Sequence, residues 1–152
     1  MPAHYQSTHS LFIQAPPEKI YALLTDWAAR AQWRPGIEVK WEGGPLAFLN
    51  QRVVFKVKNL FPYSFSYRVT GLEPPRRLYL EYTGRSLAGR NAVEITVEES
   101  GSRVAFHWMK VEPQGFLARL YFALGLGTRS HADRTQETLR MLKDYLEKTV
   151  RP

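Results

Sequence analysis

Six stretches of alternating apolar and polar residues follow one another through the middle of the chain. They cover residues 37–42, 52–58, 65–70, 78–83, 93–98 and 103–108. Turns that contain glycine or proline, such as Gly43-Gly44-Pro45, separate several of them. A period of two is typical of a strand with one buried and one solvated face, and short connections favour antiparallel neighbours. The pattern therefore predicts a six-stranded antiparallel meander.

The residues before the meander predict one more strand and two short helices. Residues 5–14 alternate in the same way as the meander. The Pro16-Pro17 pair suits the first turn of a helix, because proline presets φ and its missing donor is not needed there. Asp26 is placed to cap a second short helix, Trp27–Trp33, which Pro35-Gly36 ends. We expect the two helices to form a bent pair.

The last segment, residues 128–150, has the pattern of a long amphipathic helix without proline or glycine. Its apolar face recurs at three- and four-residue steps, at Ala132, Thr135, Leu139, Leu142, Leu146 and Val150. Residues 116–124 predict a lead-in helical segment that bends or breaks at Gly125–Gly127. A long sheet twists, and this helix is the only large element left to cover it. We predict an α+β fold: a seven-stranded curved antiparallel sheet wraps around the long C-terminal helix, with two short helices between strands 1 and 2.

The apolar face of the terminal helix changes in size along its length. Leu139, Leu142 and Leu146 are large, whereas Thr128 and the other upstream positions are small. If one sheet faces the whole helix, the upstream half leaves space beside it, and we expect an internal cavity there. The alternative is that bulky sheet residues fill in opposite the small helical ones.

Composition narrows the classes of protein to consider. The 152 residues suit a single domain over residues 1–152, and the 44% hydrophobic fraction is typical of a soluble globular protein. The absence of cysteine excludes disulfides and thiolate chemistry. The first residues lack the pattern of a signal peptide, so a cytoplasmic location is expected. The net charge of +7 is scattered, which favours a solvated basic surface over a DNA-binding one.

No pattern of metal, cofactor or catalytic residues stands out. The four histidines lack metal-ligand spacing, and the chain has no Gly-x-Ser-x-Gly elbow, phosphate-binding loop or dinucleotide fingerprint. We therefore predict no metal and no cofactor, assign no catalytic residue, and leave open whether the chain is an enzyme.

Four stretches resemble the START-like, helix-grip superfamily, and within it the polyketide cyclase/dehydrase and coenzyme-Q-binding type of lipid-transport domain. They are the strand-to-helix opening at 13–26, the exit from the second helix at 33–37, the mid-sheet turn at 72–78 and the ending at 139–147. The resemblance spans nearly the whole chain. It implies a helix-grip fold with a cavity between the long helix and the concave sheet. It does not choose a function, because no stretch is a catalytic signature.

The expected cavity wall combines wide aromatic rings from the sheet with small residues from the helices. Tyrosine and tryptophan also add polar tips that can orient a ligand. The candidate ligand-binding residues are Trp33, Phe55, Phe65, Tyr67, Tyr82, Trp108, Leu120, Leu124, Thr128, His131, Ala132 and Thr135.

The leading hypothesis is a protein that binds a bulky hydrophobic small molecule: a lipid, an isoprenoid or quinone, or a polyketide-like compound. Transport of that molecule is part of the same hypothesis. One alternative is a cyclase or dehydratase in the same cavity, with Tyr67, Tyr82 and His131 as acid–base candidates. Another is a ribosome- or protein-binding module that uses a basic sheet face with residues Arg52, Lys56, Lys58 and Arg68. We expect neither DNA binding nor stable membrane insertion, and the oligomeric state stays open.

Overall fold

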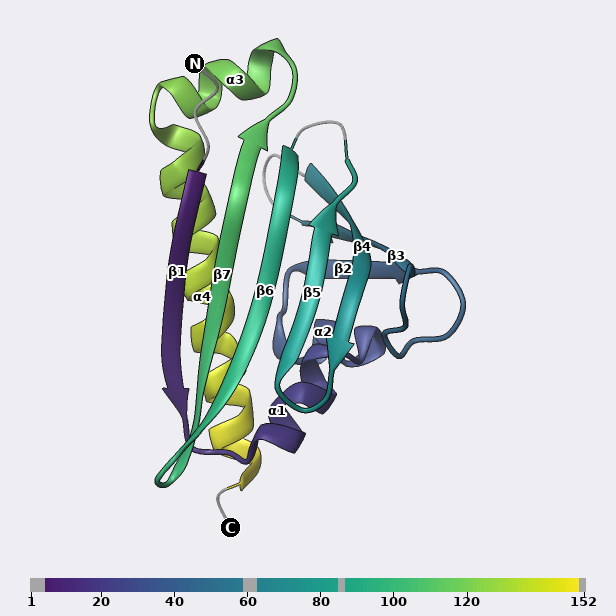
Figure 1. The fold of residues 1–152 in the computed structure, drawn as a ribbon, viewed down its shortest axis with the longest axis vertical. Coiled ribbons are helices and arrows are strands. Elements are labelled where there is room, and N and C mark those ends of the chain that lie inside the picture. The colour runs from purple at the N-terminus through teal and green to yellow at the C-terminus, as the bar shows by residue number, and fades with distance from the viewer. Residues whose placement is uncertain (1–4, 59–62, 85–86, 151–152) are drawn as a thin grey trace.

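The computed structural model describes residues 5–58, 63–84 and 87–150, which form one antiparallel sheet and four helices (Figure 1). In chain order the elements are β1 (Tyr5–Ile13), α1 (Pro17–Leu24), α2 (Trp27–Trp33), β2 (Ile37–Trp41), β3 (Arg52–Val57), β4 (Tyr63–Glu73), β5 (Arg77–Tyr82), β6 (Leu87–Glu98), β7 (Gly101–Pro113), α3 (Phe116–Ala123) and α4 (Leu126–Val150). The strand order in the sheet is β1-β7-β6-β5-β4-β3-β2. The predicted order of elements is confirmed, and so is the strand count within these residues.

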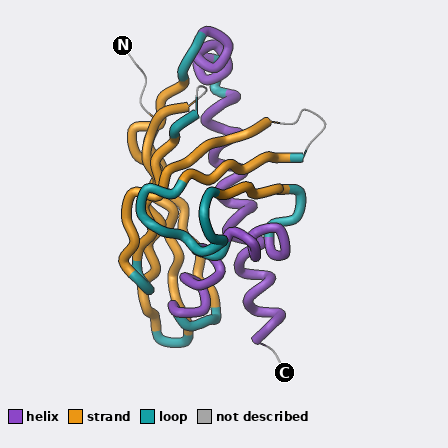
Figure 2. The backbone as a smooth tube through the Cα atoms, turned by 90° about the vertical axis from the view of Figure 1, so that its right-hand side faces the viewer, coloured by secondary structure: helices purple, strands orange, loops and turns teal. Residues whose placement is uncertain are grey.

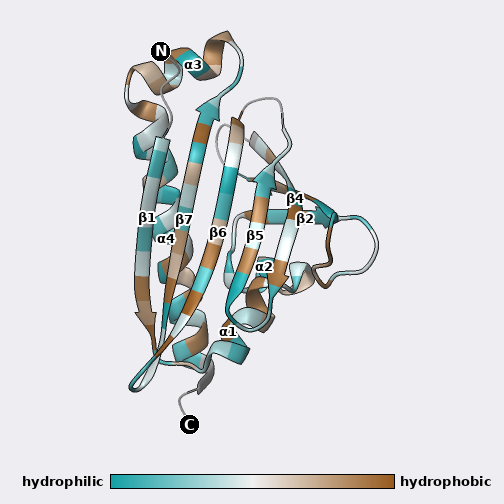
Figure 3. Cartoon of the chain, in the orientation of Figure 1, coloured by the Kyte–Doolittle hydropathy of each residue, from teal (hydrophilic) through white to brown (hydrophobic). Residues whose placement is uncertain are grey.

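The sheet curves around α4, which runs along its concave side (Figures 1 and 2). Hydrophilic and hydrophobic residues alternate along strands such as β5 and β7 (Figure 3). In β5, for example, Leu78, Leu80 and Tyr82 are buried while the residues between them are partly exposed. The α+β helix-grip fold predicted from the sequence is therefore confirmed.

Three register shifts interrupt the ladders of the described strands. One lies between Tyr5 and Ser7, where β1 pairs with β7. Another lies between Val69 and Gly71, where β4 pairs with β5, and the third lies near Gly89, where β6 pairs with β7. Gly89 has φ +139°, and a Cβ built there would lie 2.8 Å from Cα of Val111. Such bulges bend the strands that carry them. They also let β6 and β7 continue beyond the lengths predicted from alternation alone.

The corner that holds α1 and α2 depends on two polar side chains. Asp26 caps α2, since its Oδ1 accepts hydrogen bonds from N–H of Ala28 and Ala29 at 3.1 and 3.3 Å. Gln51 is 1% exposed and is saturated with partners. Its Oε1 accepts from Nε1 of Trp27 at 2.8 Å, and its Nε2 donates to two backbone carbonyls of the loop after β2. Gln51 therefore fixes α2 against the sheet.

The downstream part of α4 closes one end of the core. Leu139, Leu142 and Leu146 are between 0 and 3% exposed and belong to the same buried cluster as Ile13 and Val104. Polar bonds fasten this part to β1, because Nζ of Lys143 donates to the carbonyl of Phe12 at 2.9 Å. The edge strand β1 is thus covered by α4.

The short helix α3 buries none of its residues. It leads from the end of β7 to the start of α4, past the end of the sheet (Figure 1). Among the described residues, every helix is too short or too polar to cross a lipid bilayer.

Candidate ligand-binding cavity

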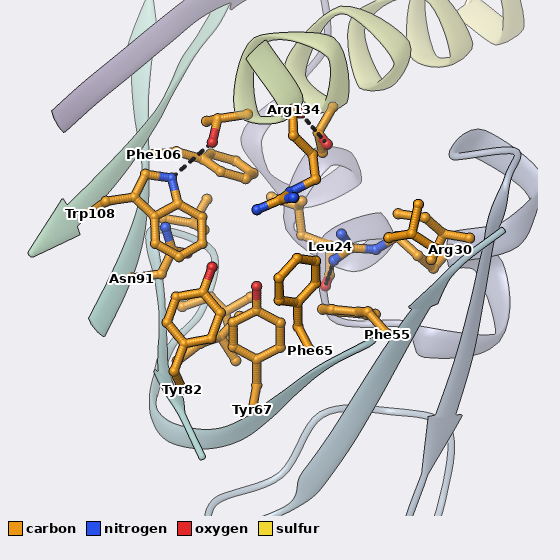
Figure 4. A pocket seen from close by; sticks show the side chains of 17 residues that line it. Leu24, Arg30, Phe55, Phe65, Tyr67, Tyr82, Asn91, Phe106, Trp108 and Arg134 are labelled. Atoms are coloured by element: carbon orange, nitrogen blue, oxygen red, sulfur yellow. Dashed lines mark hydrogen bonds between the residues drawn. The ribbon is translucent and has the colours of Figure 1, made fainter. Parts of the chain in front are cut away.

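A row of aromatic rings crosses the concave face of the sheet beneath α4 (Figure 4). Phe55 of β3 meets Tyr67 of β4 edge to face, with ring centroids 5.1 Å apart. Tyr67 stacks on Tyr82 of β5 at 4.7 Å, and Tyr82 stacks on Trp108 of β7 at 5.5 Å. Alternation directs these rings to the same face, and their strands bring them into contact. The sheet thus presents a continuous aromatic floor.

Helix α4 supplies the opposite wall with polar side chains. Nε1 of Trp108 donates to Oγ1 of Thr135 at 3.0 Å, and the hydroxyl of Tyr82 is 3.1 Å from Nε2 of His131. Arg134 lies with its guanidinium carbon 4.2 Å from the ring centroid of Phe65. The Tyr82 hydroxyl and the Trp108 indole N–H therefore both find hydrogen-bond partners on α4, as buried tyrosine and tryptophan side chains require.

Helix α2 closes the cavity on a third side with Arg30. Its side chain is 7% exposed, and its guanidinium carbon lies 4.6 Å from the ring centroid of Trp33 and 5.1 Å from that of Phe55. Nη2 of Arg30 donates to the carbonyl of Leu24 at 3.3 Å. A cation held over aromatic faces is attracted by their quadrupoles, which offsets part of the cost of burying it.

The space between these walls is small, about 70 Å³. Pockets that hold drug-sized ligands measure roughly 300–1,000 Å³, so this state has room for a few water molecules. Aromatic rings of the sheet occupy much of the volume beside His131 and Thr135. The structure therefore agrees with the alternative given above, in which bulky sheet residues fill in opposite the small residues of the terminal helix. An outer groove of about 580 Å³ lies between α4 and the residues after α2. Arg134 and Val57 border both spaces.

Tyr82 of the wall and His131, which hydrogen-bonds it from behind, are both held neutral. Burial, with smaller contributions from the positive charge of Arg134 and from the nearby His9, lowers the pKa of His131 to about 3. Burial, with a smaller contribution from Tyr67, raises the pKa of Tyr82 well above its ordinary value. Neither group is poised to exchange a proton near neutral pH.

The structure brings half of the twelve sequence-predicted site residues together on the cavity wall. These are Phe55, Phe65, Tyr67, Tyr82, Trp108 and Thr135. His131 lies just behind Tyr82 and Trp108, with its ring centroid 4.4 Å from that of Trp108. Trp33 is 2% exposed and packs behind Arg30.

The four remaining residues lie away from the cavity wall. Ala132 is half-buried on α4, and Oγ1 of Thr128 donates to the carbonyl of Gly125 at 3.1 Å in the first turn of that helix. Leu120 and Leu124 are 47% and 66% exposed. The chain turns at Gly125, where φ is +78°, so α3 does not continue the line of α4 over the sheet.

Sequence reasoning missed four polar residues of the wall: Arg30, Asn91, Arg134 and Thr138. Arg30 follows Trp27 and precedes Trp33 by three residues each, a spacing that places all three on one helical face. Asn91 is in phase with Val93 and Ile95, so the period of two already pointed it inward. The helical spacing of Arg30 and the strand phase of Asn91 were both visible in the sequence. Both residues were left out because polar side chains were expected to face the solvent.

Outside the cavity, the described residues contain no cluster of three or more histidine, cysteine, aspartate or glutamate side chains that could hold a metal ion. On the outer sheet face Arg52 and Lys56 are exposed. Lys58 and Arg68 are instead paired with Glu38 and Glu81, at 3.9 and 3.6 Å.

Residues 4–147 match the model of a protein family described as polyketide cyclase / dehydrase and lipid transport. The chain belongs to this family. The match supports the START-like, helix-grip superfamily that the sequence resembles, and the family description suggests a hydrophobic ligand. No curated protein matches the chain.

Several solved structures have the same fold. An uncharacterized protein from Rhizobium leguminosarum has a TM-score of 0.73 at 16% identity, with 97% of each chain covered. The Aha1 dimer from Colwellia psychrerythraea has a TM-score of 0.65 at 20% identity, with 94% of this chain and 96% of that chain covered. A polyketide-cyclase-like protein from Corynebacterium glutamicum has a TM-score of 0.55 at 19% identity, with 97% and 94% covered. At these identities the likeness concerns the fold alone.

Proposed function

We propose that this chain binds a bulky hydrophobic small molecule between α4 and the aromatic floor of the sheet, and that it carries such a molecule rather than transforming it. The observation behind the proposal is the cavity wall, in which four neighbouring rings face the polar side of α4 across a small space. Lipids, isoprenoids, quinones and polyketide-like compounds all have the apolar surface that this wall would bury. The family description, which combines polyketide chemistry with lipid transport, supports the same class of ligand.

Binding requires the cavity to widen. A ligand gains about 25 cal/mol for each Å² of apolar surface that leaves water, which can drive rings apart when enough surface is buried. Arg134 stands between the inner cavity and the outer groove, and it rests on Phe65. Displacing these two side chains would join the two spaces into one of ligand size. We propose this as the route of access.

The pKa values favour binding over acid–base catalysis. A cyclase or dehydratase needs a group that gains and loses protons near neutral pH. His131 has a pKa of about 3, and the pKa of Tyr82 lies well above its ordinary value, because both are buried. Their hydrogen bond positions the ring of Tyr82 as part of the wall.

Titration with the neutral fluorescent probe N-phenyl-1-naphthylamine tests the proposal. We expect saturable binding with a rise in fluorescence. Val93→Phe adds a ring at the cavity wall, where Val93 is 3% exposed, and should weaken binding at least about tenfold. Phe65→Ala should strengthen it, because truncation enlarges the cavity.

The matched control is Val97→Phe, the same substitution on the same strand at a position 71% exposed. It should leave probe binding unchanged. Thermal unfolding of each variant confirms that it folds. Absence of saturable probe binding to the wild-type protein, or equal effects of Val93→Phe and Val97→Phe, would reject the proposed function.

A further inference from the structure

Arg30 is a buried cation whose hydrogen-bonding capacity is not used up. It is 7% exposed, and its Nε is buried without a hydrogen-bond partner. Its hydrogen bond to the carbonyl of Leu24 engages only Nη2. The guanidinium points from α2 toward the space between Phe55, Phe65 and the other rings (Figure 4). A buried donor without an acceptor lowers the stability of the folded protein unless another group accepts its hydrogen bond.

Arg34, which follows Arg30 by one helical turn, provides an internal comparison. It is 6% exposed, yet its Nε donates to Oγ1 of Thr138 at 3.1 Å and its Nη2 pairs with Glu137 at 3.7 Å. The protein therefore satisfies one buried arginine of this region with its own side chains. It provides no such partner for Nε of Arg30.

In the part of the chain that the structure describes, the lining of the cavity contains positively charged side chains but no negatively charged ones. Among the described residues that line it there are two arginines, Arg30 and Arg134, and neither aspartate nor glutamate. Burial lowers the pKa of Arg30 to about 10, and the nearby Arg34 also lowers it, so the guanidinium is still a cation at neutral pH. An uncompensated buried charge is expensive, and a carboxylate seated on a guanidinium is the strongest common way to compensate it.

A second unused donor lies elsewhere on the wall. Asn91 of β6 is 2% exposed, and its Nδ2 has no hydrogen-bond partner. It lies beside Trp108, whereas Arg30 lies well apart from it, with aromatic rings between the two (Figure 4). Both unused groups donate hydrogen bonds, so the site is suited to a ligand that accepts them.

We infer that the ligand of this cavity is an anionic amphiphile, whose carboxylate or similar acid group is held by Arg30 while its apolar body lies on the aromatic floor and a neutral oxygen further along it accepts from Asn91. The inference rests on the proposed function and specifies its ligand class. Arg30 then anchors the charged end, and the unused Nε–H is the donor that the ligand satisfies.

Displacement of bound N-phenyl-1-naphthylamine by dodecanoate and by 1-dodecanol at pH 8 tests the inference. The two competitors have the same chain length and differ in the charge of the head group. For the wild-type protein we expect dodecanoate to displace the probe at a concentration at least about tenfold lower than dodecanol, as a charge-assisted hydrogen bond in a buried site requires. Arg30→Gln should make the two displacing concentrations equal by raising that of dodecanoate, while the concentration of dodecanol needed for displacement stays the same.

Arg52→Gln is the control, because Arg52 is exposed on the outer sheet face. It removes the same charge and should keep the tenfold preference for dodecanoate over dodecanol. This control distinguishes a carboxylate anchor in the cavity from the general attraction of an anion to a basic protein. If Arg30→Gln does not fold, Arg30→Lys is measured in its place. Since an ammonium lacks the planar fork of a guanidinium, the preference should fall to about threefold.

The outcomes separate the two proposals. Probe binding with equal displacement by dodecanoate and dodecanol overturns the anionic ligand and leaves the proposed function standing. A preference that survives substitution of Arg30 assigns the charge recognition elsewhere and overturns the role of Arg30. A loss of stability with no change in preference does the same, because it marks Arg30 as a packing residue. No probe binding at all rejects the proposed function itself.

Discussion

The two parts of α4 meet the same sheet in opposite ways. The downstream part, residues 139–146, inserts leucines into an aliphatic core with 0 to 3% of their surface exposed. The upstream part, residues 131–138, presents His131, Thr135 and Thr138, which hydrogen-bond the tips of sheet rings or the side chain of Arg34. One part is held by packed hydrocarbon and the other by polar contacts around a small space.

This difference separates stability from function within one helix. Packed leucines have few alternatives, so the downstream part fixes the helix on the sheet. Hydrogen bonds to rings can break and re-form when a ring turns, so the upstream part can yield to a ligand without releasing the helix. Substitutions in the two parts should therefore differ in size and in kind.

The largest effect is expected in the downstream part. Leu142 is 0% exposed, and Leu142→Ala should lower the free energy of unfolding by about 2–5 kcal/mol, because it removes buried methyl groups and leaves a cavity. Urea denaturation measures the change. Leu120→Ala on α3, where the leucine is 47% exposed, should change it by less than about 0.5 kcal/mol. Similar losses for the two variants would contradict the role of the downstream part of α4 as a packed anchor of the helix.

An intermediate effect should appear in the upstream part as a dependence on pH. His131 has a pKa of about 3 in the folded protein and about 6.5 when unfolded, so between these values the unfolded state binds the extra proton. Stability should therefore fall as the pH decreases through this window. The contribution of this one group is about 2 kcal/mol between pH 7.5 and pH 5.

His131→Gln should remove that contribution and flatten the pH profile of the free energy of unfolding. His107→Gln removes a partly exposed histidine of β7 and is measured beside it, so that the two profiles show which histidine causes the slope. A slope that His131→Gln leaves intact would show that another group causes it.

The smallest effect is expected for the bond between Trp108 and Thr135. Thr135→Val leaves the indole N–H of Trp108 buried without an acceptor, which should cost about 1–2 kcal/mol. The double variant Trp108→Phe/Thr135→Val should cost less than the sum of the two single variants. Urea denaturation of the four proteins of this cycle gives the coupling. Strict additivity would mean that the hydrogen bond contributes nothing.

The sequence predicted the fold well because local patterns and the global arrangement agree. Alternation gave the strands, Asp26 gave the cap of α2, and the absence of proline and glycine gave the length of α4. The bounds of β6 and β7 were underestimated, because the bulge near Gly89 breaks the period of two. A change of phase of this kind cannot be read from alternation.

The candidate site was predicted only in part. The aromatic floor follows from alternation, which directs Tyr67, Tyr82 and Trp108 to the same face of the sheet, and their role in binding stays a prediction. Leu120 and Leu124 were included on the assumption that α3 continues the face of α4, which the turn at Gly125 prevents. Arg30 was omitted because a charged side chain costs so much to bury that the solvent is the default assignment.

At the bulge near Gly89 the backbones of β6 and β7 approach closely, and the rings that occupy the concavity come from other positions. The curvature of the scaffold and the size of its interior are thus specified by separate residues. Exchanging Phe55, Phe65 or Tyr67 for smaller side chains would resize the chamber while the sheet keeps its shape. A designer could in this way fit new guests to the same frame, one ring at a time.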